Sequence, residues 1–157
     1  GLQKLMDIKE LALQTAITQI GKEEIPRGSN WGEPVKTYLK SVGINFPASW
    51  CMAFVYWCYQ QVSLELGIPN PAVKSGGVLA TWNKTPKQFK GSTPVIGSVF
   101  IMDFGHGLGH TGIVEKFDDT YVYTIEGNTN DTGSREGYEV CRRKRKRSSI
   151  KGYITLS

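Results

Sequence analysis

The chain contains one stretch, ASWCMAFVYWCY at residues 48–59, that is too apolar to lie on a protein surface. From Cys51 to Leu66, apolar residues recur at helical spacing, so one seam of a helix faces a core. That seam consists of Cys51, Val55, Cys58, Val62 and Leu66. Phe54, Tyr56 and Trp57 make the first turns apolar on their other sides as well. Such a helix belongs in the middle of a domain.

Cys51 falls in the first turn of this predicted helix. Pro47 ends any earlier regular element, and Ser49 is a residue type that commonly caps helix N-termini. The unpaired N–H groups and the positive end of the helix dipole favour an anion there, and a thiolate is one. A Cys at such a position beside a cation is a nucleophile, whereas a free Cys is more often a small core residue. Position alone leaves both interpretations of Cys51 open.

Length and composition describe one ordinary globular domain, residues 1–157. The sequence has no apolar run of transmembrane length and no recognisable signal peptide, but it begins at Gly1, which leaves a cleaved export signal open. Three cysteines are an odd number, which argues against a disulfide framework. We expect Cys58 in the core and Cys141 in a strand.

Helix-like patterns come first in the chain and strand-like patterns follow. The predicted helices span residues 5–20, 32–41, 51–67 and, as a short piece, 77–82. The predicted strands span residues 99–103, 111–117, 121–126, 138–147 and 150–156. This order is typical of an α+β fold with an antiparallel sheet.

The chain has two histidines, and the strand pattern places one of them near a carboxylate. If the strands on either side of Asp118 form a hairpin centred near that residue, paired positions sum to about 236. His110 then lies opposite Glu126, with Cβ atoms about 5 Å apart, and Asn128 is a diagonal neighbour. A bulge would slide this register. An imidazole beside a carboxylate and an amide has the geometry of an oriented catalytic base.

A metal site at His106 and His110 is disfavoured. The two residues are four apart, but three glycines surround them and no HExxH pattern is present. We interpret His106 as a loop residue near the candidate site.

Three motifs together resemble a known family. They are Trp50-Cys51 at the head of the apolar helix, His110-Thr-Gly-Ile-Val opening a strand, and Glu126-Gly-Asn128 closing the next strand. In this order and spacing they resemble the CHAP domains, cysteine- and histidine-dependent amidohydrolases/peptidases of the NlpC/P60 superfamily. The likeness extends to residues 28–33 and to the closing strand at 150–153.

The resemblance implies a papain-like fold, with N-terminal helices packed on a C-terminal antiparallel sheet, and hydrolysis of amide bonds in bacterial peptidoglycan. It assigns the nucleophile to Cys51, the base to His110, the third catalytic member to Glu126 and a fourth polar residue to Asn128. Whether Glu126 or Asn128 orients the ring stays open. So does the choice between N-acetylmuramoyl-L-alanine amidase and endopeptidase.

The same resemblance bears on cofactors and location. Some members bind calcium through acidic residues just before the Cys, but residues 43–50 contain no carboxylate, so we expect no metal and no cofactor. An enzyme of this kind works at the cell wall, whether secreted, periplasmic or delivered by a phage. Trp31, Trp50 and Trp82, together with His106, are candidates for lining the substrate groove, although packing in the core is an equally good role for each tryptophan.

A run of six cations, Arg142–Arg147, carries more than the whole net charge of +5, because the remaining residues sum to 5 − 6 = −1. Such runs occur in nucleic-acid-binding segments. The flanking residues predict β-structure, so we interpret the run as surface charge on a strand, with contact to anionic wall polymers as a secondary effect and nucleic acid disfavoured.

Two other functions remain open from the sequence. One is a non-catalytic module of the same fold that binds the wall or another polyanion. The other is a cysteine amidase acting on a small amide conjugate.

Overall fold

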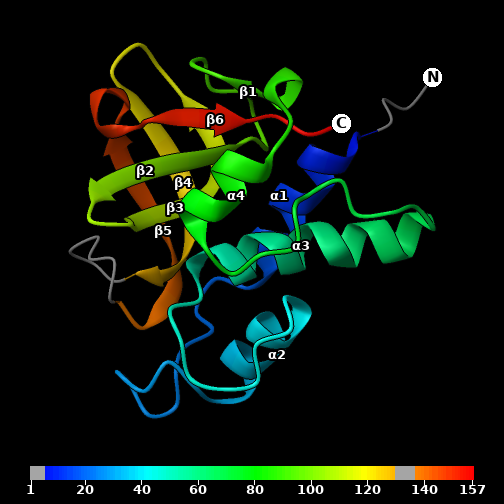
Figure 1. Ribbon diagram of the computed structural model, residues 1–157, viewed down its shortest axis with the longest axis vertical. Helices are drawn as coiled ribbons and strands as arrows, with labels where there is room; N and C mark the ends of the chain where they lie inside the picture. Colours follow the sequence, from blue (N-terminus) through cyan, green and yellow to red (C-terminus); the bar gives the residue numbers. More distant parts are fainter. Residues whose placement is uncertain (1–5, 130–136) are drawn as a thin grey trace.

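The computed structural model describes residues 6–129 and 137–157. Within these residues four α-helices precede the sheet: α1 (Ile8–Thr18), α2 (Glu33–Ser41), α3 (Cys51–Leu66) and α4 (Val78–Lys84) (Figure 1). The strands are β1 (Lys90–Gly91), β2 (Val99–Gly105), β3 (Leu108–Phe117), β4 (Tyr121–Thr129), β5 (Glu139–Lys146) and β6 (Gly152–Ile154). Short 3-10 turns occupy Lys87–Phe89 and Arg147–Ser149. The predicted α+β class is confirmed.

The described strands form one antiparallel sheet with the order β1-β6-β2-β3-β4-β5. The late strand β6 is inserted between β1 and β2, so β3 and β4 lie inside the sheet rather than at its edge. These two strands carry His110 and Glu126. Each of the two strands is therefore paired with a neighbouring strand on both sides.

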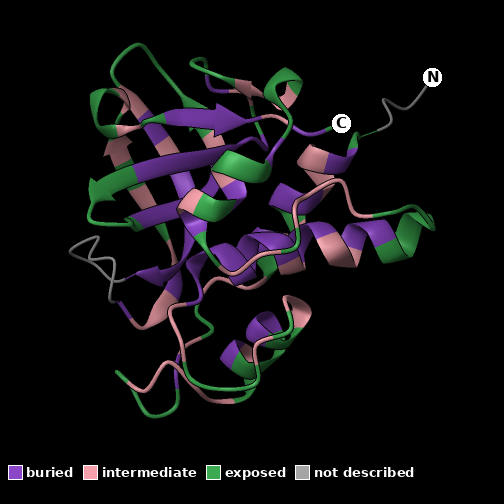
Figure 2. Ribbon diagram, viewed as in Figure 1, coloured by how far each residue is buried: buried purple, intermediate pink, exposed green. Residues whose placement is uncertain are grey.

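Helix α3 is the central element of the core, as the sequence predicted. It packs against α1, α2, β3 and β4, and its first six residues are all buried. Figure 2 shows it buried where it begins and exposed where it ends. The predicted inward seam is wrong at its last member, because the final turns project beyond the sheet and leave Leu66 50% exposed.

The sheet is buried on both faces at its centre. One face packs on the helices through Val99, Ile101, Ile113 and Ile125. The other encloses a second cluster of Phe100, Met102, Val114, Val122 and Tyr153. None of the helices in the described part of the chain is long and apolar enough to cross a membrane.

Candidate active site

The backbone presents Cys51 at the start of α3. Trp50 is the N-cap residue, and no side chain caps the helix, so the prediction of Ser49 as the cap is wrong. The first intrahelical bond runs from the Phe54 N–H to the Trp50 carbonyl, at 2.9 Å. The N–H groups of Cys51, Met52 and Ala53 precede that bond and have no partner within the helix. The buried Cys51 thiol therefore sits at the positive end of the helix dipole.

His110 lies on β3 and is fully buried. Its Nε2 lies 2.7 Å from Oε1 of Glu126. Its Nδ1 is also buried and makes no hydrogen bond within normal geometry to any described residue. Burial alone would lower the pKa of His110, but interactions with Cys51 and Glu126 outweigh that effect and raise it to about 9. The raised pKa favours the protonated ring, in which Nδ1 is the nitrogen not bound to Glu126.

Glu126 is a fully buried carboxylate between two cations. Besides His110, it accepts two hydrogen bonds from Arg145, one of them from Nε to Oε2 at 2.9 Å, and one from Thr124 Oγ1 to Oε2 at 2.7 Å. Burial would raise the pKa of Glu126, but hydrogen bonds from Arg145 and His110 lower it to about 2. Glu126 is therefore the group that holds the ring.

The predicted register of the β3–β4 hairpin is wrong. Ile113 pairs with Ile125 and Val114 with Thr124, so paired positions sum to 238, and a bulge follows between Val114 and Lys116. Continued along the strands, this register puts Asn128 opposite His110, and Glu126 on the diagonal. His110 and Glu126 still lie on the same face of the sheet, because the sum of paired positions changed from 236 to 238, and an even change keeps each side chain on its predicted face.

Gly112 explains how the diagonal contact forms. In the continued register it lies opposite Glu126, and a Cβ built on it would lie 2.7 Å from Cγ of Glu126. With no side chain at position 112, the Glu126 side chain passes over that strand and reaches the His110 ring.

Asn128 is close to this group in the sheet but does not contact the ring. Its side chain is fully buried, and neither its nitrogen nor its oxygen has a hydrogen-bond partner among the described residues. Its φ of 55° lies in the left-handed region, which Asn adopts more readily than most residues.

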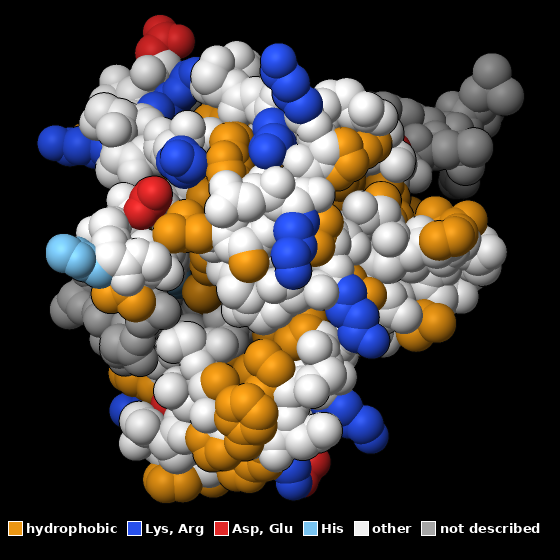
Figure 3. Space-filling view, in the orientation of Figure 1, with side chains coloured by type: hydrophobic (Ala, Val, Ile, Leu, Met, Phe, Trp, Pro, Cys, Tyr) orange, Lys and Arg blue, Asp and Glu red, His pale blue; other side chains and the backbone are white. Residues whose placement is uncertain are grey.

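The four residues predicted to line a substrate groove differ in how far they are buried. Trp50 is wholly buried: its Nε1 donates to Glu24 at 2.8 Å and its ring stacks on Tyr38, so its prediction as a groove residue is wrong. Trp31 is half-buried with Lys36 over its ring, and hydrophobic side chains gather over the part of the molecule that holds α2 (Figure 3).

Trp82 and His106 stay predictions. Trp82 is half-buried against Gly152 of β6, which β2 separates from β3. His106 is exposed between β2 and β3, with a φ of 57°.

Two charged residues, Arg145 half-buried and Glu24 buried, were not predicted from the sequence. Arg145 belongs to the basic run, and only the alternation of β5 could have shown that it faces Glu126. Glu24 is 1% exposed and accepts hydrogen bonds from Trp50 and from the backbone N–H of Gly28. It lies in a loop, where no periodic pattern reports burial.

Among residues 6–129 and 137–157, no group of three or more His, Cys, Asp or Glu side chains is arranged to hold a metal ion. Among the described residues Cys51, Cys58 and Cys141 form no disulfide, and Cys58 is buried in the core while Cys141 is half-buried on β5.

Known proteins share this fold and these motifs. The CHAP domain family model matches residues 43–128, more than half of the chain, and that range contains Cys51, His110, Glu126 and Asn128. Two crystal structures of Ly7917 are similar, one of them with the hydrolyzing product of MDP. Their TM-scores are 0.56 and 0.55, at 18% and 17% sequence identity.

The two alignments cover 94% and 96% of this chain but only 62% and 63% of the Ly7917 chain. The chain thus spans less than two thirds of that protein, and a likeness at this identity concerns the fold. No curated protein matches the sequence.

Proposed function

Because the chain belongs to the CHAP domain family, within the papain-like NlpC/P60 group, we propose that it is a peptidoglycan hydrolase that cleaves an amide bond with Cys51 as nucleophile. The observation that carries this proposal is the Cys51 thiol at a helix N-terminus, in electrostatic interaction with a buried His110 ring whose Nε2 lies 2.7 Å from Glu126. The place of action is the bacterial cell wall, reached by secretion, in the periplasm or through a phage.

The proposed reaction begins from a thiolate–imidazolium pair. The Cys51 thiolate attacks the carbonyl carbon of the amide, and the carbonyl oxygen becomes an oxyanion. The N–H groups at the start of α3, that of Cys51 first, stabilise this oxyanion. His110 then gives its proton to the leaving amine as the C–N bond breaks, which leaves a thioester on Cys51. A water molecule, deprotonated by His110, attacks the thioester, and breaking of the C–S bond releases the acyl group as a carboxylic acid and restores the thiolate–imidazolium pair.

Glu126 supplies electrostatics and orientation in this scheme. Its carboxylate favours the charged form of His110, and its hydrogen bond to Nε2 fixes the ring so that Nδ1 serves Cys51. Arg145 keeps that carboxylate ionised. Asn128 offers a buried amide that is free to bind substrate.

The deciding experiment measures peptide release from purified cell walls by Cys51→Ala, with Cys141→Ser as the matched thiol control. We expect Cys51→Ala to lose turnover, by a factor of roughly 10⁴ or more, while its circular dichroism spectrum stays that of the parent. Iodoacetamide should alkylate Cys51 faster than Cys58 or Cys141, and activity should be lost at the same rate as Cys51 is alkylated. Full activity in Cys51→Ala would end the proposal, and no activity in the parent protein would favour a wall-binding module.

Mass spectrometry of the released fragments identifies the bond. A new carboxylate on the lactyl group of the amino sugar means an amidase, and a new amine within the peptide means an endopeptidase. MDP is the first small substrate to test, because Ly7917 has been crystallised with its hydrolyzing product.

A further inference from the structure

The basic run of β5 is divided between the two faces of the sheet. Arg145 points to the face of Glu126 and is bound to it, and Arg147 donates to the carbonyl of Asp118 at 2.8 Å. The alternate residues Arg142, Lys144 and Lys146 are exposed on the other face. Two residues of the run therefore bind within the fold and the candidate active site, and three face solvent.

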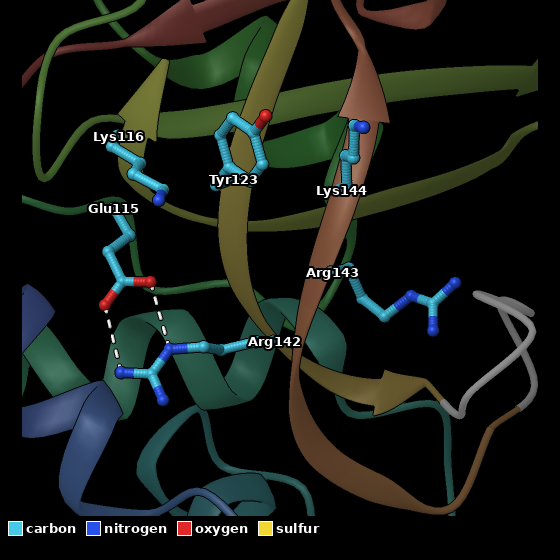
Figure 4. Close-up of a pocket in the computed structure, with 6 residues that line it drawn as sticks. All are labelled: Glu115, Lys116, Tyr123, Arg142, Arg143 and Lys144. Atoms are coloured by element: carbon cyan, nitrogen blue, oxygen red, sulfur yellow. Dashed lines mark hydrogen bonds and ion pairs between the residues drawn. The ribbon is translucent and has the colours of Figure 1, made fainter.

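The outward half borders a groove. A cavity of about 490 Å³ is lined by Glu115, Lys116, Tyr123, Arg142, Arg143 and Lys144. Lys116, Tyr123 and Lys144 are register partners across β3, β4 and β5, and they lie side by side in Figure 4. Arg143 points away from them in the same view, so its guanidinium does not belong to this row of side chains.

The two lysines of the groove are positioned by aromatic rings. The Nζ of Lys144 lies 4.0 Å from the centroid of Tyr121, and the Nζ of Lys116 lies 4.7 Å from that of Tyr123. In the described part of the chain no carboxylate oxygen lies within 4 Å of either ammonium group. The pKa of Asp118 is lowered mainly by hydrogen bonds from the N–H groups of Tyr121 and Thr120, and the charge of Lys144 contributes least.

Arg142 lines the same groove as the two lysines, but its charge is neutralised by a carboxylate. Both of its bonds go to Glu115, at 3.0 and 3.1 Å, so this pair is neutral. The uncompensated positive charge of the face therefore comes from Lys116 and Lys144, with Lys146 further along β5.

We propose that this face binds a linear phosphodiester polymer of the bacterial wall. Lys144 and Lys146 are two residues apart on one face of β5, where side chains recur about every 6.8 Å, and Lys116 lies two strands away from Lys144, about 9.6 Å across the sheet. These cations can contact successive phosphates of one polymer chain that crosses the face. The tyrosine rings carry ammonium groups on their faces, so they are not open for the base stacking by which single-stranded nucleic acid is bound.

That the protein meets this polymer at the cell wall rests on the proposed function, but binding of the polymer to the groove does not require hydrolysis by Cys51. Tyr123 and Lys144 alternate with Thr124, Glu126 and Arg145, so the groove and the candidate catalytic group lie on opposite faces of β4 and β5. Polymer bound to the groove therefore lies on the other side of these strands from Glu126 and Arg145.

The test measures binding of Cys51→Ala, in which turnover is blocked, to three probes. These are walls with their phosphodiester polymer intact, the same walls stripped with cold hydrofluoric acid, and single-stranded DNA with a matched number of phosphates. The variant Lys116→Gln/Lys144→Gln is compared with Lys84→Gln/Lys87→Gln, which removes the same charge from exposed positions elsewhere. Hydrolysis of soluble muropeptides is measured separately, in the Cys51-containing proteins.

We expect intact walls to be bound more tightly than stripped walls, and the Lys116→Gln/Lys144→Gln variant to lose that difference. Its slope of log K against log salt should be less negative by about 0.7 for each lysine removed, while the Lys84→Gln/Lys87→Gln slope stays that of the parent. Hydrolysis of soluble muropeptides should be unchanged.

Three outcomes would overturn the proposal: equal binding to stripped walls, equal loss in both double variants, or stronger binding to DNA through the same lysines. The last would assign the groove to nucleic acid. Failure of muropeptide hydrolysis with polymer binding intact would refute the proposed function and leave the groove standing.

Discussion

At the scale of single residues, the candidate site is a line of alternating charges. The carboxylate of Glu126 lies between the His110 ring and the Arg145 guanidinium, and all three are largely buried. A buried charge is stable only when its partners are present, and removing one partner commonly costs about 3–5 kcal/mol. His110 thus owes its positive charge to a carboxylate that is itself kept ionised by Arg145.

Glu126→Gln should move the alkaline limit of activity. His110 must be protonated to give its proton to the leaving amine, and its pKa of about 9 sets the pH above which kcat/KM falls in the parent. Loss of the carboxylate removes a cause of that raised pKa, so the fall should come at lower pH. The pH profile of kcat/KM on a soluble muropeptide measures this. An alkaline limb that stays near pH 9 would show that Glu126 does not set the charge of the ring.

Arg145→Lys should lower kcat more than it changes KM. Lysine keeps the charge but cannot make the two parallel bonds that hold both oxygens of Glu126, so the His110 ring loses its fixed orientation. We expect about a tenfold fall in kcat with soluble substrate, equivalent to about 1.4 kcal/mol. The matched control is Lys144→Arg, one position away on the opposite face, which should retain parental kcat. Parental kinetics in Arg145→Lys would mean that its charge alone suffices.

At the scale of elements, the sequence predicted those helices and strands whose residue types form a recognisable pattern. The apolar pattern placed α3 and located Cys51 at its start, and strand-like runs separated by Gly, Asp and Asn identified β2 to β5. It did not reveal the bulge after Val114, because a bulge is one extra residue with no signature in the pattern, and the register of His110 depends on it. Arg145 was misplaced because charged residues usually lie in solvent, and partners on another strand are invisible in a linear chain.

Gly112→Ala tests how β3 accommodates the Glu126 side chain. The added Cβ would lie 2.7 Å from Cγ of Glu126 and from the Ile125 carbonyl oxygen, and 2.8 Å from the Phe100 ring. Overpacking of this kind costs about 1–3 kcal/mol, and it should push Glu126 off the ring. We expect a lower melting temperature together with lower kcat. Gly91→Ala, which has open space around its Cβ, is the control and should change neither. Unchanged activity in Gly112→Ala would show that Glu126 can reach His110 by another path.

At the scale of the whole molecule, this charged group links stability to pH. The pKa of His110 is raised from 6.5 to about 9, so its contribution is complete below pH 6.5 and is lost as pH rises through 9. The pKa of Glu126 is lowered from 4.5 to about 2, so its contribution is present above pH 4.5 and is lost as pH falls through 2. We expect thermal stability to fall between pH 6.5 and 9, by at most about 3 kcal/mol.

The measurement is the melting temperature as a function of pH for the parent and for Glu126→Gln. The alkaline fall should be smaller in the variant, because its His110 starts with a less raised pKa. Parallel curves for the two proteins would assign the pH dependence to other groups.

The division of β5 between two faces has a consequence for the lengths that this strand tolerates. Insertion of a single residue between Cys141 and Arg145 would reverse parity, turning the guanidinium that holds Glu126 toward water and an outward cation into the interior. Insertion of two residues would restore parity. Descendants of this chain should therefore gain or lose residues here in pairs, since an odd change damages catalysis and polymer attachment in one event.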